Sequence, residues 1–434
     1  MNTLRVVDSG QINEENIYNY IPRADTQFEL IRDSVSKIIQ AVKNKGDQAL
    51  IEFTHEFDKV KLTNKEIQVS KEELSEAYKK IDPSLLHAIY HAKENLIKFN
   101  EAQKREDWFI EIEKGIVAGQ IYRPIETIGI YIPGGIAIYP STVLMIATPA
   151  YVAGTKEIIM CSPPQKDKKI APEILVAANE FDIEKIYKLG GAQAIAAMAY
   201  GTETVPRVQK VVGPGGIWVN VAKQILSNII AIDAPAGPSE ILIIADESAD
   251  PNYVLVDFIS QIEHDPNNIG IIVTDSENLI NQIINSIDKY VFQSSRRVII
   301  EQALKSNSII IKAKNIEDCI RISNTIAPEH LEILTNNPDD ILKKVTNAGA
   351  VFLGPYSPVP LGDYGAGTNH ILPTGGSAKK YSGLNLYDFL KVIDVLKCEK
   401  EGLEIFSETA MKLAEYEGFF AHKRSIEERL KDKD

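Results

Sequence analysis

Short apolar segments alternate with helical ones from about residue 127 to residue 311, and this alternation restricts the possible folds more than any other feature. The first run of such segments begins near residue 127, and the same rhythm returns after Ser239. Strands that alternate with helices form parallel sheets with helices on both faces. We therefore predict an α/β fold with two doubly wound parallel-sheet domains of incomplete Rossmann-like design. The expected strands are residues 128–132, 157–161, 185–189, 210–212, 241–244, 269–273 and 308–311.

The segments outside this alternation are predicted to be mainly helical. Residues 27–54 carry apolar side chains at helical spacing, and the charge-rich tail from Ser382 onward is typical of an appended helical segment. Because 434 residues are too many for one core, we expect several domains. The expected division is an N-terminal extension (1–26), a discontinuous first α/β domain (27–130 with 240–380), a second α/β domain (131–239) and a C-terminal helical tail (381–434).

Charge and composition exclude several classes of partner. The chain has 47 Lys and Arg against 60 Asp and Glu, a formal net charge of −13, which argues against a nucleic-acid partner. Its three cysteines are scattered without a Cys-x-x-Cys pair, as in a reducing compartment. The longest apolar stretch, 129–154, contains three prolines, so we expect no membrane span. The first residues lack the apolar core of a signal peptide, and a cytoplasmic location is the expectation.

A carboxylate and an imidazole stand side by side at Glu329 and His330, directly after Pro328. Proline does not continue a helix, so the pair is expected in a loop or at the start of an element. Taken alone, such a dipeptide is more often solvated surface than a catalytic site. Other polar motifs change that balance, namely Gln261-Ile-Glu-His264, Gly362-Asp-Tyr364, Thr368-Asn-His370 and Glu417-Gly-Phe-Phe-Ala-His422.

Further motifs extend over nearly the whole chain. They include Lys45-Gly-Asp-Gln-Ala-Leu50, Tyr131-Ile-Pro-Gly-Gly135, Leu189-Gly-Gly-Ala-Gln-Ala-Ile195 and Asp233-Ala-Pro-Ala-Gly-Pro-Ser-Glu240. In this order, the motifs together resemble the histidinol dehydrogenase family. The resemblance implies an NAD-dependent L-histidinol dehydrogenase, which oxidises L-histidinol to L-histidine through L-histidinal. Two NAD⁺ are reduced in this reaction, which closes histidine biosynthesis.

The resemblance also implies one zinc ion per subunit, and the residues themselves support part of such a site. Asp250-Pro251 predicts a helix start, and a helix from there places Gln261 and His264 on one face. From the residues alone, an ordinary polar helix face explains this pair better, because a glutamine oxygen is a weak metal ligand. The zinc ligands that the family implies are Gln261, His264, Asp363 and His422.

The family assigns the proton chemistry to Glu329 and His330. An imidazole pKa near 6.5 suits His330 as a base at neutral pH, and Glu329 is the candidate for activating water in the second oxidation. In the family, the tail reaches the partner subunit's active site, so a homodimer with shared sites is implied. The implied substrate-binding residues are Ser239, Gln261, His264, His330, Asp363, Glu417 and His422.

No Gly-x-Gly-x-x-Gly follows any predicted strand, so the usual dinucleotide fingerprint is absent. The resemblance implies cofactor binding at Tyr131, Gln193 and Gly216 instead. At the last of these positions the family has an asparagine, whereas Gly216 offers no side chain. Asn220 is four residues further on, but the sequence gives no reason to transfer the role to it. How NAD is held therefore stays open, as does the role of His370.

Three alternatives remain at the level of sequence. A related zinc- and NAD-dependent dehydrogenase of another small polar alcohol would keep the metal and the Glu329–His330 pair, but Ser239 and Glu417 favour histidinol. A zinc-dependent hydrolase would need no nucleotide, and Tyr131 and Gln193 argue against it. A silent metabolite-binding protein would have no need for an intact catalytic pair.

Overall fold

The computed structural model describes residues 4–13, 15–21, 27–134, 138–234 and 237–431. The chain divides into two compact units, which are described separately below. The first unit is Met1–Ala102 with Glu126–Asp388, and the second is Gln103–Ile125 with Phe389–Asp434. Among the described residues, the structure has no helix that combines the length and the apolar character needed to span a membrane.

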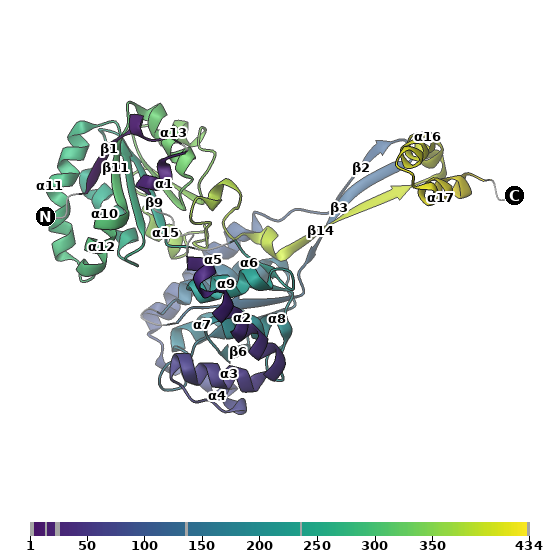
Figure 1. The fold of residues 1–434 in the computed structure, drawn as a ribbon, viewed down its shortest axis with the longest axis horizontal. Coiled ribbons are helices and arrows are strands. Elements are labelled where there is room, and N and C mark those ends of the chain that lie inside the picture. Colours follow the sequence, from purple (N-terminus) through teal and green to yellow (C-terminus); the bar gives the residue numbers. More distant parts are fainter. Residues whose placement is uncertain (1–3, 14, 22–26, 135–137, 235–236, 432–434) are drawn as a thin grey trace. The chain divides into compact units, whose positions relative to one another are not determined.

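A six-stranded parallel sheet forms one half of the first unit (Figure 1). Alternate residues of its central strand face opposite sides: Ile241 and Ile243 pack in one core, and Leu242 and Ile244 in the other. Both faces are therefore buried, as a parallel sheet requires. In spatial order the strands are β1 (Arg5–Asp8), β11 (Ser308–Lys312), β10 (Ile269–Thr274), β9 (Glu240–Ala245), β12 (His330–Leu334) and β13 (Ala350–Leu353). The helices of this half are α1 (Ile17–Tyr20), α10 (Pro251–Ile262), α11 (Glu277–Gln293), α12 (Arg297–Asn307), α13 (Ile316–Ile326), α14 (Pro338–Leu342) and α15 (Val359–Asp363).

A five-stranded parallel sheet forms the other half of the first unit. Its strands in spatial order are β6 (Lys185–Lys188), β5 (Glu157–Ser162), β4 (Thr127–Tyr131), β7 (Lys210–Val212) and β8 (Ala231–Ile232). Its helices are α6 (Pro140–Ala153), α7 (Pro172–Asn179), α8 (Gly191–Tyr200) and α9 (Ile217–Leu226). Apart from β1, which pairs with β11 at an edge, the chain in each sheet starts in the middle, adds strands on one side and then adds strands on the other. The predicted pair of doubly wound sheets is thereby confirmed.

The N-terminal helices pack on the five-stranded half, which corrects the expected domain division. α2 (Gln27–Lys45) contacts α8 and α9, α4 (Lys71–Lys80) contacts α7, and α5 (Pro83–Glu101) contacts α6. The expectation grouped residues 27–130 with 240–380 instead. The apolar stripe of α2 shows that a helix face is buried, but it carries no signal of which sheet buries it. The short elements of this region are α3 (Asp47–Phe53), the π-helical turn η2 (Thr54–Asp58) and η3 (Asn64–Glu66).

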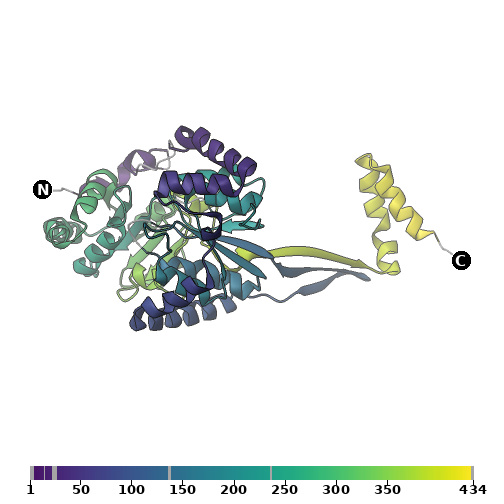
Figure 2. The same ribbon diagram turned by 90° about the horizontal axis from the view of Figure 1, so that it is seen from below.

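The second unit is a three-stranded antiparallel sheet followed by two helices (Figures 1 and 2). Its strands in spatial order are β14 (Leu390–Cys398), β3 (Ile116–Pro124) and β2 (Trp108–Glu113), and its helices are α16 (Lys400–Tyr416) and α17 (Phe420–Leu430). The two helices agree with the predicted helical tail, whereas the sheet was missed. The remaining short helical turns of the chain are η1 (Ser9–Gln11), η4 (Ser377–Lys379) and η5 (Leu386–Phe389).

Candidate active site

Glu329 and His330 lie between the end of α13 and the start of β12. Ala327 ends α13 in the left-handed conformation (φ 53°), Pro328 follows, and His330 is the first residue of the strand. The pair thus lies where the proline predicted it, at the start of an element. The side chains are not solvated surface, however, because Glu329 is only 5% and His330 only 4% exposed. Two buried titratable groups side by side are a feature of functional sites.

The backbone of Glu240 holds both members of the pair. β9 lies beside β12, and the Glu240 N–H donates to Glu329 Oε2 at 2.8 Å. The Glu240 carbonyl lies 3.1 Å from His330 Nδ1. Since a carbonyl only accepts, this contact requires a hydrogen on Nδ1, which leaves Nε2 as the nitrogen that can take a proton. His330 Nε2 is buried, and no described group hydrogen-bonds to it.

Burial and nearby charges shift the pKa values of Glu329 and His330. Burial raises the pKa of Glu329 to about 7. Burial alone would lower the pKa of His330, but the charges of Glu329 and Asp363 outweigh it and raise that pKa to about 9. His330 Nε2 lies 3.7 Å from Asp363 Oδ1, too far for a hydrogen bond but close enough for strong attraction. The basicity of His330 therefore depends on the charge of Asp363.

His370, whose role the sequence left open, connects Asp363 to the five-stranded half of the unit. Its Nδ1 lies 3.0 Å from the Asp363 carbonyl, which again requires the hydrogen on Nδ1. Its Nε2 then accepts from the Thr142 hydroxyl on α6, at 3.2 Å. The neighbouring Asn369 donates to the Met145 carbonyl of the same helix. Burial lowers the pKa of His370, so its ring is uncharged at pH 7 and links Asp363 to α6 through hydrogen bonds.

The predicted helix start at Asp250-Pro251 matches the structure, because the Asp250 side chain caps α10 and Pro251 is its first residue. Gln261 is buried in the last turn of α10, and His264 lies just beyond the helix, exposed. Asn268 joins this region to Ser239: its amide donates to the Gln261 carbonyl and accepts from the Ser239 N–H.

Three of the four predicted zinc ligands, Gln261, His264 and Asp363, belong to the first unit, and His422 lies on α17 in the second. The charges of Asp363 and His264 both act on the pKa of His370, so both side chains lie near the His370 ring. Across the described ranges, no group of three or more His, Cys, Asp or Glu is placed to hold a metal. The donor types of the first unit fit zinc chemically, but they supply one imidazole, one carboxylate and one amide, which is an incomplete set.

The predicted cofactor positions lie at the carboxyl ends of the five-stranded sheet. Tyr131 ends β4, and its hydroxyl accepts from the Gly191 N–H at the start of α8. Gln193 follows in the first turn of α8, with both amide atoms buried and without a hydrogen bond to any described group. Gly216 caps the start of α9, in the loop after β7. β4 and β7 flank the point where the strand order reverses, which is where doubly wound sheets bind ligands.

A buried ion pair that the sequence did not reveal fixes the loop after β7. Lys223 Nζ pairs with Asp233, and both side chains are almost fully buried. Lys223 also donates to the Gly213 carbonyl at 2.7 Å, while Asp233 accepts from the Gly213 N–H at 2.8 Å. Both polar groups of the Gly213 backbone are thus held by one charged pair. No spacing rule links Lys223 to Asp233, so only the folded chain identifies them.

Comparison with known proteins decides the family. The family model described as histidinol dehydrogenase matches residues 21–430. The chain belongs to the histidinol dehydrogenase family. It is therefore an oxidoreductase of a family that uses NAD.

Individual relatives agree with this assignment over almost their full length. A histidinol dehydrogenase of Methanocaldococcus jannaschii is 47% identical over 422 residues, 97% of each chain. One of Clostridium acetobutylicum is 45% identical over 430 residues, 99% of each chain. The crystal structure of histidinol dehydrogenase from Elizabethkingia anophelis superimposes with a TM-score of 0.93 at 41% identity, covering 98% of each chain. The family that the motifs resemble and the α/β fold that the strand–helix alternation predicts are both confirmed.

Within the first unit, the predicted residues of this family form two groups. Ser239 and the Glu329–His330 pair lie at the amino ends of β9 and β12, and Gln261 and His264 lie at the end of α10. Asp363 ends α15, and its Oδ1 lies 3.7 Å from His330 Nε2. Tyr131 and Gln193 gather at the carboxyl end of β4, with Gly216 in the loop after β7. Glu417, which follows α16, and His422 belong to the second unit.

Proposed function

We propose that this protein oxidises L-histidinol to L-histidine through bound L-histidinal, with one zinc ion per subunit and two NAD⁺ per turnover. The buried Glu329–His330 pair, in a chain that matches the family over nearly its whole length, carries the proposal. Each oxidation removes a hydride from carbon and a proton from oxygen. The nicotinamide takes the hydride, so the protein must take the proton.

His330 is the proposed proton acceptor. Its Nδ1 hydrogen is committed to the Glu240 carbonyl, so the ring can accept only at Nε2, which faces Asp363. In the second oxidation, Glu329 is the proposed base that removes a proton from water as the water adds to the aldehyde carbon. Its raised pKa, about 7, makes it a stronger base than an exposed glutamate. Burial around both groups excludes bulk water that would compete for these protons.

Gln261, His264 and Asp363 of one chain, with His422 of the tail, would hold the zinc ion. When bound, zinc would fix the nitrogen atoms of histidinol and would lower the pKa of His330 by offsetting the charge of Asp363. Ser239, Glu417 and His330 would complete the substrate site. Tyr131, Gln193 and the backbone at Gly216 would contact NAD.

We further propose a homodimer in which each tail completes the partner's site. The second unit exposes many large apolar side chains on both its sheet and its helices, and such surface in a water-soluble chain favours an interface. They include Trp108, Phe109, Ile110, Ile112, Val392, Ile393, Leu396, Leu413, Tyr416, Phe419 and Phe420.

Hybrid dimers test the shared site. His330→Gln and His422→Ala chains are each expected to be inactive, but a mixed dimer would contain one intact site. Refolding the two together should restore about a quarter of wild-type activity, because half of the dimers are mixed and each has one working site. No recovery in verified mixed dimers would show that each chain completes its own site.

The activity itself is tested by adding L-histidinol and NAD⁺ to the zinc-loaded protein. Formation of NADH is expected with L-histidinol and with L-histidinal. A dehydrogenase of another small alcohol would reduce NAD⁺ only with that alcohol, and a hydrolase would form no NADH with any of them.

A further inference from the structure

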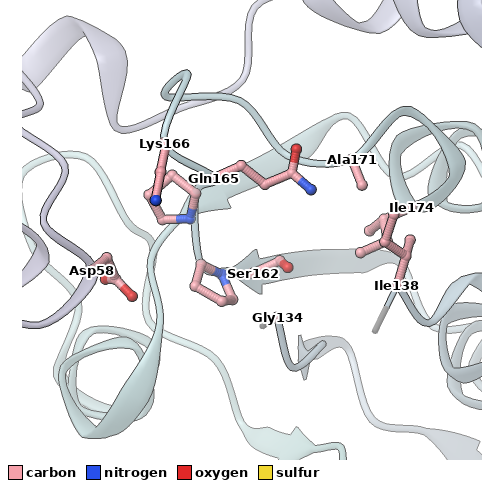
Figure 3. Close-up of a pocket in the computed structure, with 10 residues that line it drawn as sticks. Asp58, Gly134, Ile138, Ser162, Gln165, Lys166, Ala171 and Ile174 are labelled. Atoms are coloured by element: carbon pink, nitrogen blue, oxygen red, sulfur yellow. The ribbon is translucent and has the colours of Figure 1, made fainter. Parts of the chain in front are cut away.

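Glu332 is a buried carboxyl group that the proposed mechanism does not use. Its side chain is 0% exposed, and neither carboxyl oxygen accepts a hydrogen bond from an N–H or O–H group of the described residues. Asp58 and Ser162 also have buried oxygens without donors, but they line a pocket of about 260 Å³ at the carboxyl ends of the five-stranded sheet (Figure 3). A bound molecule can reach them there. Glu332 lies within a packed core instead, so its partner must belong to the protein.

The strand that begins with the proposed base also carries Glu332. It follows His330 by two residues on β12, so both side chains leave the same face of the sheet. Its neighbours across the sheet are Ile243 on β9 and Phe352 on β13. Both belong to the apolar core that also contains Phe258 of α10. An ionised carboxylate in such surroundings would be strongly unfavourable.

Asp257 on α10 is the polar group that reaches Glu332, and the two carboxyl groups lie within hydrogen-bonding distance. Carboxylates only accept hydrogen bonds, so this contact becomes a bond when one of the two carries a proton. Glu332 is fully buried and Asp257 half-buried, so the charge stays on Asp257 and the proton on Glu332. Burial and the charge of Asp257 accordingly raise the pKa of Glu332. Asp363 on α15 faces His330 instead.

The contact between Asp257 and Glu332 links the two elements that carry much of the candidate site. Asp257 precedes Gln261 by about one helical turn, so their side chains lie on the same side of α10. Other side chains of α10 on this face are apolar, and apolar packing has no preferred direction. A hydrogen bond does have one, so it can fix where α10 lies along β12.

We propose that Asp257 and Glu332 share one proton in a carboxyl–carboxylate hydrogen bond, which positions Gln261 of α10 relative to His330 of β12. The role of this bond rests on the proposed function, because it takes Gln261 as a zinc ligand and His330 as the base. Asp257 and Glu332 are positioning residues, since they act through these two side chains.

Infrared spectroscopy tests the shared proton directly. At about pH 8.5 ordinary carboxyl groups are ionised, so a protonated carboxyl band reports a group with a strongly raised pKa. Wild type is expected to show this band and Glu332→Gln to lack it. Glu329→Gln is expected to keep the band. If wild type and Glu332→Gln have the same carboxyl bands, Glu332 carries no proton and the proposal is overturned.

Matched substitutions test the positioning role. Glu332→Gln keeps a donor, because its amide can donate to Asp257, whereas Glu332→Met has a similar volume and no donor. Glu332→Met is expected to raise the Kd for zinc about tenfold in competition with a chelator, and to lower kcat for L-histidinol to a similar extent. Glu332→Gln and Asp257→Asn keep a hydrogen bond and are expected to stay within about twofold of wild type in both. Equal zinc affinities in Glu332→Met and Glu332→Gln would refute the positioning role.

Stability separates this role from a general effect on folding. Replacing a buried carboxyl group with an apolar side chain of similar volume is often neutral or stabilising, and half-buried Asp257 can still be hydrated. Glu332→Met is therefore expected to unfold at no lower urea concentration than wild type although its zinc affinity falls. A parallel loss of stability and zinc affinity would count against positioning. If wild type shows the infrared band but binds no zinc, the proposed function fails, and with it the role of the bond but not the bond itself.

Discussion

Replacing Gly213 with alanine should damage the cofactor loop, and the structure gives the size of the effect. Gly213 has φ +131°, a conformation that residues with a Cβ rarely adopt, and the added Cβ would lie 2.1 Å from the Tyr131 carbonyl oxygen. Ordinary contacts begin at 3.4 Å, so the two backbones must separate. That movement pulls Gly213 away from the Lys223–Asp233 pair, which then loses two charge-assisted hydrogen bonds in a buried place.

The backbone strain costs about 1–3 kcal/mol, and weakening the buried contacts adds about 1–3 kcal/mol. We therefore expect the free energy of unfolding to fall by about 3 kcal/mol and the Kd for NADH to rise at least tenfold. Gly216→Ala is the matched control in the same loop: it has φ −63°, and no atom lies within 4 Å of the new Cβ. That variant should lose less than about 1 kcal/mol.

Urea unfolding and NADH fluorescence titration measure the two quantities on each variant. The reasoning requires a large difference between two alanines placed three residues apart. If Gly213→Ala matches Gly216→Ala in both stability and NADH affinity, the loop is not held as described.

Three further variants give independent checks. Gly216→Asn introduces the side chain that the family has at this position, and no atom lies within 4 Å of the new Cβ. One added hydrogen bond of about 1 kcal/mol should lower the KM for NAD⁺ about fivefold in initial-rate assays. An unchanged KM would show that the backbone already fills this role. His330→Gln should lower kcat by about 10²–10⁴-fold, while calorimetry should still detect histidinol binding. A near-normal kcat would show that His330 is not the base. Burial and the neighbouring Asp257 raise the pKa of Glu332 to about 10, so the folded state keeps a proton that the unfolded state loses above its ordinary value of 4.5. Wild-type stability should therefore fall as pH rises from 5 to 9, and Glu332→Gln should gain stability relative to it over that range; parallel urea-unfolding profiles would contradict this pKa.

The alternation of strands and helices was sufficient to predict both parallel sheets, because it reflects local periodicity. The packing partner of α2 could not be predicted in the same way. Its buried stripe, which includes Val35 and Ile39, would fit either sheet, and only the folded chain places it on α8 and α9. The charge-rich sequence from Ser382 onward predicts a helical tail, and β14 lies within that stretch. Because its residues are mostly exposed, no buried face marks it as a strand. Its β-branched Val392, Ile393 and Val395 were the available signal.

Part of the candidate site could be predicted from side-chain motifs, whereas the part that depends on backbone geometry could not. Motifs identified Glu329, His330 and Asp363, but the group that orients the pair is the backbone of Glu240, which has no side-chain signature. His370 stood in a motif without a role until its contacts with Asp363 and Thr142 were seen. Contacts between residues so far apart in sequence arise from the tertiary fold, which no local pattern encodes.

The stoichiometry of complete turnover tests the central claim most directly. Purified zinc-loaded protein is supplied with excess NAD⁺ and a known, limiting amount of L-histidinol, and both NADH and the final product are quantified. Two NADH for each histidinol consumed, with L-histidine as the product, is the expected result. One NADH with free aldehyde accumulating, or histidinol consumed without any NADH, would contradict the roles given to Glu329 and His330.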